Sequence, residues 1–255
     1  MIFDTHSHYE DDAFAQDRHE LLLSLKEKEI GWIVDVGSDM KTSHEAVELA
    51  KQYEFAYAAV GVHPSEVEEL SEQDMQVLSD LCACDKVVAV GEIGYDFHWP
   101  EPGREIQKKW FCRQIELAKQ VDLPIIIHSR DAAEPTMQLI RETKAYDCGG
   151  VIHCYSYSKE QAKEYVDMGF YIGVGGVVTF KNAKKLHQTV EAIPLEHLVL
   201  ETDCPYMSPE PYRGNRNDST KLHYVAQRIA EIKGITKEEV VNITTANAKN
   251  MYRLQ

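Results

Sequence analysis

The chain has 255 residues, of which 44% are hydrophobic and 27% are charged. This length suits one (β/α)8 barrel and also accommodates two smaller domains. The composition excludes disordered and low-complexity proteins, and no apolar run approaches the roughly 18 residues of a membrane helix, so we expect no membrane partner. The first residues contain no basic region followed by an apolar stretch. We therefore expect no secretory signal and a cytoplasmic protein.

Acidic residues outnumber basic ones by 42 to 27, which gives a formal net charge of −15. Such a charge disfavours a protein that coats long duplex nucleic acid through counterion release. It leaves room for an enzyme that engages a few phosphates at a metal site. The six cysteines of a cytoplasmic chain of this length are interpreted as reduced residues, not as a disulfide framework.

Short β-branched segments alternate with longer amphipathic segments from one end of the chain to the other. This alternation predicts parallel βα units. The expected strands, eight in number, are residues 2–8, 32–37, 56–62, 87–93, 124–128, 150–154, 170–174 and 198–202. The expected helices are residues 18–28, 43–53, 72–81, 105–121, 132–143, 159–168, 182–191, 220–233 and 237–252.

No linker rich in Pro, Gly or Ser interrupts the series, and no shift in composition marks a boundary. We therefore predict the α/β class, as a single (β/α)8 TIM barrel with additional C-terminal helices, in one domain over residues 1–255. An open doubly wound sheet is the alternative. It would place a glycine-rich phosphate loop after the first strand, where this sequence has none.

A histidine or a carboxylate stands at the C-terminal end of strand after strand. In a (β/α)8 barrel these ends meet at one mouth, where such enzymes keep their active sites. His6 and His8 point to the same side of the first strand because side chains alternate with period two. The candidate metal ligands from five strands are His6, His8, Glu92, His128, His153 and Asp203.

A single histidine at a strand end is more often a hydrogen-bonded polar residue than a metal ligand. Convergence from five strands is different, because four imidazoles and two carboxylates without a cation would be crowded and poorly satisfied. The set therefore predicts a metal site. Four imidazoles suit Zn²⁺, Mn²⁺, Co²⁺ or Ni²⁺ better than Mg²⁺.

Several ordered motifs resemble those of the TatD-related metal-dependent deoxyribonucleases, within the wider amidohydrolase-like (β/α)8 hydrolases. They are FDTHSH at residues 3–8, GVHP at 61–64, GEIGYD at 91–96, IHSR at 127–130, IHCY at 152–155 and LETDCPY at 200–206. The resemblance spans nearly the whole chain and implies two divalent metal ions. Because the family is generally described as magnesium-activated, Mg²⁺ or Mn²⁺ is expected first, with Zn²⁺, Co²⁺ and Ni²⁺ as alternatives.

The resemblance also implies how the ligands are shared between the ions. His6, His8 and Asp203 would hold one ion, while His128 and His153 would hold the other. Glu92 would bridge the two ions and thereby serve catalysis as well as binding. A hydroxide between the metals would attack the substrate, with both attacking and leaving oxygens clamped.

Further residues are candidates for catalysis and substrate binding. Asp203 is the best candidate for the proton acceptor, as its match in the family implies. Arg130 stands two residues after His128 and is interpreted as a clamp for a phosphoryl oxygen, with a surface salt bridge as the alternative. For His63, the resemblance suggests a contact with the substrate phosphate or the transition state. Packing is the competing interpretation.

Asp4 and Glu201 lie two residues before His6 and Asp203, and hence one layer deeper on the same face. They suit the orientation of the metal ligands. A buried structural carboxylate is the competing account.

The segment 211–218 follows the last strand and brings Arg213 and Arg216 near the expected mouth, where they would bind substrate. It resembles the family segment Arg-Gly-Lys-x-Asn-Glu-Pro. It departs from that pattern at Asn215, where lysine is usual, and at Asp218-Ser219, where Glu-Pro is usual. These departures concern contacts with the phosphate backbone and the preferred length of substrate.

The leading functional hypothesis is a metal-dependent hydrolase, a deoxyribonuclease of the exonuclease type. It would act on DNA ends or short oligonucleotides, because the acidic surface gives little attraction to long duplex. No heptad pattern is visible, so a monomer is expected. The alternative is an amidohydrolase or esterase acting on a small-molecule or aminoacyl-nucleotide substrate. A metal-free barrel used as a binding module is a third hypothesis, against which the complete ligand set argues.

Overall fold

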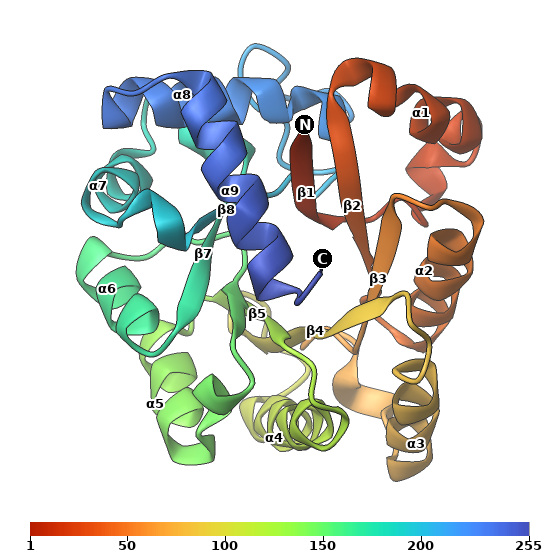
Figure 1. The fold of residues 1–255 in the computed structure, drawn as a ribbon. Coiled ribbons are helices and arrows are strands. Elements are labelled where there is room, and N and C mark those ends of the chain that lie inside the picture. The colour runs from red at the N-terminus through yellow and green to blue at the C-terminus, as the bar shows by residue number, and fades with distance from the viewer. Residues whose placement is uncertain (255) are drawn as a thin grey trace. The chain divides into compact units, whose positions relative to one another are not determined.

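The structure is a computed structural model that describes residues 1–254. Its strands follow one another in the sheet in chain order, from β1 to β8. The strands (Figure 1) are β1 (Ile2–Ser7), β2 (Ile30–Val36), β3 (Ala56–Val60), β4 (Val87–Asp96), β5 (Ile125–Arg130), β6 (Gly150–Ile152), β7 (Phe170–Val174) and β8 (Leu198–Leu200).

Helices follow the strands along the chain, as the alternating pattern predicts. The α-helices of the described residues are α1 (Arg18–Ser24), α2 (Met40–Gln52), α3 (Glu72–Leu81), α4 (Arg104–Val121), α5 (Ala133–Thr143), α6 (Lys159–Asp167), α7 (Lys184–Ala192), α8 (Leu222–Lys233) and α9 (Lys237–Met251). The prediction of a (β/α)8 TIM-barrel fold with additional C-terminal helices is confirmed. Within residues 1–254, no helix has the length and apolar character needed to span a membrane.

Strand β4 is longer than the sequence predicts. It continues beyond Ile93 to Asp96, and β5 continues to Arg130. The parallel register explains both extensions, because Gly94 pairs with His128 and Asp96 pairs with Arg130. A hydrogen-bonded ladder between two strands prolongs both of them, and this pairing is not encoded in the hydrophobic pattern of either strand.

The contacts between Cα atoms divide the chain into two compact units. The first unit comprises Met1–Val34, Cys154–Asp167 and Tyr171–Gln255, and the second comprises Asp35–His153 and Met168–Phe170. The single domain predicted over residues 1–255 stays a prediction.

Within the first unit, α9 and the residue that follows it anchor the start of β8 and the middle of β1. Thr236 and Glu239 form a capping box that begins this helix. The Tyr252 hydroxyl, just after the helix, donates a hydrogen bond of 2.8 Å to the carbonyl oxygen of Thr5. The Asn247 amide donates bonds of 2.8 Å to the carbonyl oxygens of Leu195 and Leu198. The backbone that precedes His6 is therefore fixed by buried polar contacts.

Within the second unit, glycines let β4 approach β5 closely. A Cβ atom added at Gly94 would lie 1.9 Å from the carbonyl oxygen of His128, and one added at Gly91 would lie 2.6 Å from Ile126 Cβ. Gly94 also has a φ of 150°, a conformation that residues with a side chain rarely adopt. These glycines hold His128 beside the strand that carries Glu92.

Candidate metal centre

His6, His8 and Asp203, all in the first unit, form a cluster that we name the first ligand group. The Nε2 atoms of His6 and His8 lie 3.1 Å apart. Asp203 Oδ1 lies 3.7 Å from His6 Nε2 and 3.4 Å from His8 Nε2. The ligand atoms of all three side chains thus converge, and the single metal ion that the family resemblance implies for them stays a prediction.

The backbone holds the first ligand group in place. The Asp203 amide donates a 2.9 Å hydrogen bond to the carbonyl oxygen of His6, and the His8 amide donates one of 2.9 Å to that of Cys204. Asp203 has a φ of 58°, in the left-handed region that is uncommon for residues other than glycine. This backbone conformation, three residues after the end of β8, directs the Asp203 carboxylate towards the two imidazoles.

The buried carboxylate of Asp4 also holds this backbone in place through hydrogen bonds. Its carboxylate accepts hydrogen bonds from the hydroxyls of Thr202 and Ser219 and from the amides of Thr202 and His6. Burial raises the pKa of Asp4 to about 7, although these bonds act in the opposite direction. Asp4 thus has the contacts of a buried structural carboxylate, and through the backbone it positions His6.

Glu92, His128 and His153 form the second ligand group, which lies in the second unit. Glu92 Oε1 lies 2.7 Å from His128 Nδ1 and 3.5 Å from His153 Nε2. Glu92 and His153 are both 4% exposed. One carboxylate oxygen of Glu92 therefore lies near a nitrogen of each imidazole, and its contact with His128 is a hydrogen bond.

His63 lies beside the second ligand group. Its ring contacts that of His128 edge to face at a centroid distance of 4.3 Å, and its ligand atom lies within 4.8 Å of those of Glu92 and His128. His63 Nδ1 accepts a 3.1 Å hydrogen bond from the Ser65 amide. In the neutral ring the proton is therefore on Nε2, and burial lowers the pKa of His63 to about 4.

A carboxylate faces the second ring nitrogen of one histidine in each group. Asp96 Oδ2 lies 3.2 Å from His128 Nε2, and Glu10 Oε1 lies 3.5 Å from His8 Nδ1. Carboxylates in this position commonly fix the tautomer and orientation of metal-binding histidines. The sequence alone indicates no role for either residue. Sequence spacing raises both as candidates, because Glu10 follows His8 by two residues and Asp96 follows Glu92 by four, but it does not distinguish them from other acidic residues.

The negative charge of nearby carboxylates favours positive charge at His8 and His128. Burial acts to lower the pKa of His8, but Asp203 and Glu10 outweigh it and hold that pKa well above its usual value. Burial also acts to lower the pKa of His128, and hydrogen bonds to Asp96 and Glu92 raise it overall. The same negative potential that favours a proton favours a divalent cation.

The donor sets fit divalent metal ions. Bond lengths of about 2.1 Å to nitrogen or oxygen place neighbouring ligands of a tetrahedral or octahedral ion about 3.0 to 3.4 Å apart. The distances within the first ligand group run from 3.1 to 3.7 Å, and Glu92 lies 3.5 Å from His153 in the second, whereas the 2.7 Å between Glu92 and His128 is the length of a hydrogen bond. Imidazole and carboxylate donors suit Zn²⁺, Mn²⁺, Co²⁺ and Ni²⁺, as the sequence indicates.

The arginines assigned to substrate binding differ in their surroundings. Arg130 ends β5 and is exposed. The Arg213 guanidinium lies 4.4 Å from the centroid of the Phe180 ring. Arg216 is paired with Asp17 at 2.6 Å. The substrate contacts of all three arginines stay predictions, and Arg216 would have to leave Asp17 to make one.

Replacement of Asp96 by asparagine is expected to weaken metal binding at the second ligand group about 10- to 100-fold, because the amide is a poorer acceptor for the His128 Nε2–H group. A Mn²⁺ titration in competition with a coloured chelator measures the change. Asp85→Asn is the matched control, since Asp85 is an exposed residue of a turn. Equal metal affinity in the Asp96 variant and the wild type would contradict the orienting role.

Comparison with known proteins identifies relatives along the whole chain. The family model described as TatD related DNase matches residues 3–253. The metal-dependent hydrolase YabD of Bacillus subtilis is 45% identical over 254 residues, which cover 100% of both chains. The 3'-5' ssDNA/RNA exonuclease TatD of Shigella flexneri is 29% identical, with 98% of each chain covered.

Solved structures agree with these sequence relatives. The crystal structure of YJJV, a TatD homologue from Escherichia coli K12, matches with a TM-score of 0.94 and 30% identity, and the match covers 100% of this chain and 98% of that one. A TatD family hydrolase from Entamoeba histolytica matches with a TM-score of 0.86, at 26% identity and with 98% and 97% covered. The chain belongs to the TatD-related DNase family of metal-dependent hydrolases.

Proposed function

We propose that the protein is a deoxyribonuclease of the exonuclease type that uses two divalent metal ions. The observation that carries this proposal is the pair of ligand groups: three ligand atoms converge in the first, and in the second a Glu92 oxygen lies near one nitrogen of His128 and one of His153. His6, His8 and Asp203 are the proposed ligands of one ion, and Glu92, His128 and His153 those of the other. The bridging role that the resemblance implies for Glu92 stays a prediction.

Bound divalent ions supply Lewis acidity and lower the pKa of water, so that water becomes a nucleophile at neutral pH. The chain itself must accept the proton that the attacking water loses. The Asp203 side chain is 21% exposed, whereas that of Glu92 is 5% exposed. We therefore assign the proton acceptor to Asp203, which solvent and substrate can reach.

His63 and Arg130 are the proposed contacts of the phosphodiester. In the neutral ring, His63 carries its proton on Nε2, so that it can donate a hydrogen bond to a phosphoryl oxygen. The exposed Arg130 guanidinium can pair with a second oxygen of the same group. Both contacts favour a phosphate-bearing substrate over a neutral amide.

DNA ends and short oligonucleotides are the proposed substrates. A net charge of −15 gives little non-specific attraction to long duplex DNA, whereas bound metal ions provide a local positive charge that a terminal phosphodiester can reach. The relative from Shigella flexneri is named for exonuclease action on single-stranded DNA and RNA. We expect the enzyme to work as a monomer in the cytoplasm.

Release of mononucleotides from end-labelled single-stranded DNA tests this proposal. We expect purified protein to release them with Mg²⁺ or Mn²⁺, to stop in chelator, and to resume when metal is restored. Labels at the 5′ and 3′ ends give the polarity. If metal-loaded protein releases no nucleotide, the proposed nuclease function is wrong. That result would favour an amidohydrolase or esterase, in which the activated water attacks a carbonyl carbon.

A further inference from the structure

Trp99 is an exposed tryptophan in the segment that joins β4 to α4. Its exposed fraction is 58%, whereas Trp110 in the following helix is 2% exposed. Tryptophan is highly buried on average, because its large apolar surface gains free energy when it leaves water. An indole that stays in solvent is a candidate for contact with a ligand.

Hydrogen bonds anchor the segment that carries Trp99. The buried Gln107 amide donates to the carbonyl oxygens of Asp96 and Pro102, at 2.9 Å and 2.8 Å, and its oxygen accepts a 2.9 Å bond from the Asp96 amide. The Phe97 amide donates a 2.9 Å bond to the carbonyl oxygen of Arg130. The segment is thus fixed at both ends and presents the indole in a defined place, which lowers the entropy cost of binding.

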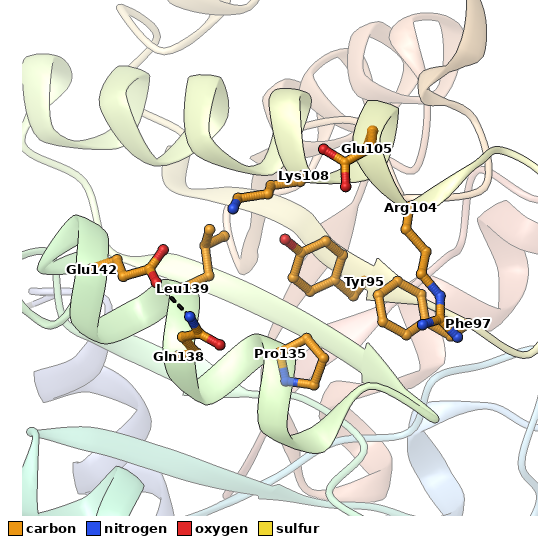
Figure 2. Close-up of a pocket in the computed structure, with 9 residues that line it drawn as sticks. All are labelled: Tyr95, Phe97, Arg104, Glu105, Lys108, Pro135, Gln138, Leu139 and Glu142. Atoms are coloured by element: carbon orange, nitrogen blue, oxygen red, sulfur yellow. Dashed lines mark hydrogen bonds between the residues drawn. The ribbon is translucent and has the colours of Figure 1, made fainter.

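Phe97, the other aromatic side chain of this segment, is already covered. The Arg104 guanidinium lies 4.3 Å from the centroid of its ring, and Figure 2 shows the two side chains lying against each other. The pocket that they line has a volume of about 180 Å³, below the roughly 300 Å³ of small ligand sites. Phe97 is therefore not available to a nucleobase, whereas Trp99 is.

Trp99 lies close to the second ligand group along the chain. Asp96 contacts His128 with one carboxylate oxygen, and the other accepts a 2.9 Å hydrogen bond from the His98 amide. The His98 ring in turn contacts Trp99 edge to face, at a centroid distance of 4.8 Å. Trp99 is three positions after Asp96, so their Cα atoms are at most about 11 Å apart.

The net negative charge of the protein favours binding of a single strand through base stacking. Proteins that bind single strands combine a basic groove for the backbone with aromatic side chains on which bases stack. A chain with a net charge of −15 offers little electrostatic attraction to the phosphate backbone. Stacking does not depend on counterion release and accepts every base, because every base has a π face.

We propose that the Trp99 indole stacks on a nucleobase of a single-stranded substrate and thereby positions the adjacent phosphodiester at the second ligand group. This inference rests on the proposed nuclease function and names the single strand as its substrate. The free base, which is unstacked only in a single strand or at a frayed end, is the recognised element. Trp99 is a binding residue in this proposal and takes no part in proton transfer.

Steady-state kinetics of Trp99 variants on a short oligothymidylate test the proposal. We expect Trp99→Ala to raise KM about 10-fold with kcat nearly unchanged, and Trp99→Phe to keep a KM close to the wild type. Tyr224→Ala is the matched control, because Tyr224 is an aromatic residue that is 39% exposed on α8. An abasic residue at the stacked position should remove the difference between wild type and Trp99→Ala.

Fluorescence gives a readout that is independent of turnover. In the Asp203→Asn background, added oligothymidylate should quench tryptophan emission, and Trp99→Phe should abolish the quenching while preserving binding. Nucleotide release by the wild type with an unchanged KM in Trp99→Ala would overturn the stacking role alone. A metal-loaded wild type that releases nothing would overturn the nuclease function and the stacking role together.

Discussion

Replacement of Asp203 by asparagine is expected to lower the rate of metal-dependent nucleotide release about 10²- to 10⁴-fold. The change removes the negative charge of a proposed metal ligand, 3.4 Å from His8 Nε2, and the proposed acceptor of the proton from water. An amide is neutral and hardly basic, so it replaces neither property. Initial rates on end-labelled single-stranded DNA, with Mg²⁺ or Mn²⁺ in excess, measure the loss.

Asp12→Asn is the matched control for this variant, because Asp12 is exposed and lies in the same unit. Its rate should equal that of the wild type. Metal analysis separates the two roles of Asp203, since loss of a ligand lowers the metal content whereas loss of the proton acceptor alone does not. A variant that binds metal and releases nucleotides at the wild-type rate would refute the assignment of Asp203.

The alternation of strands and helices could be predicted because each element has its own hydrophobic period. The side chains of the first ligand group could be predicted as neighbours because parallel strands place their C-terminal ends together, and their role as metal ligands stays a prediction. The end of β4 could not be predicted, because the pairing of Asp96 with Arg130 joins residues of two strands. The orienting carboxylates Glu10 and Asp96 escaped prediction for a related reason: acidic residues are common, and only a distance to a histidine distinguishes these.

Side-chain partners far apart in sequence are the least predictable part of the site. Arg216 pairs with Asp17, which is 199 positions away, and no local sequence pattern predicts that contact. Asp4 shows the same difficulty. Its position two residues before His6 suits a contact with an imidazole, yet its carboxylate accepts bonds from Thr202 and Ser219. Period and spacing locate a residue on a face, and packing decides which atoms it meets.

Replacement of Gly94 by alanine is expected to lower the free energy of unfolding by about 2 to 6 kcal/mol, through backbone strain and overpacking together. The new Cβ atom would lie 1.9 Å from the His128 carbonyl oxygen, so the backbone of β4 or β5 must move. Because His128 belongs to the second ligand group, the same movement would displace a proposed metal ligand. Urea denaturation followed by metal analysis of the folded protein measures both effects.

Gly149→Ala separates the clash from the conformational strain of alanine. Gly149 has a φ of 70°, and an added Cβ atom would meet nothing within 4 Å. This control should lose only about 1 to 2 kcal/mol and keep its full metal content. The Gly94 variant should retain metal at the first ligand group while losing it at the second, because the atoms nearest to the added Cβ all belong to His128. Equal losses of metal from both groups would show that the displacement of His128 is not the cause.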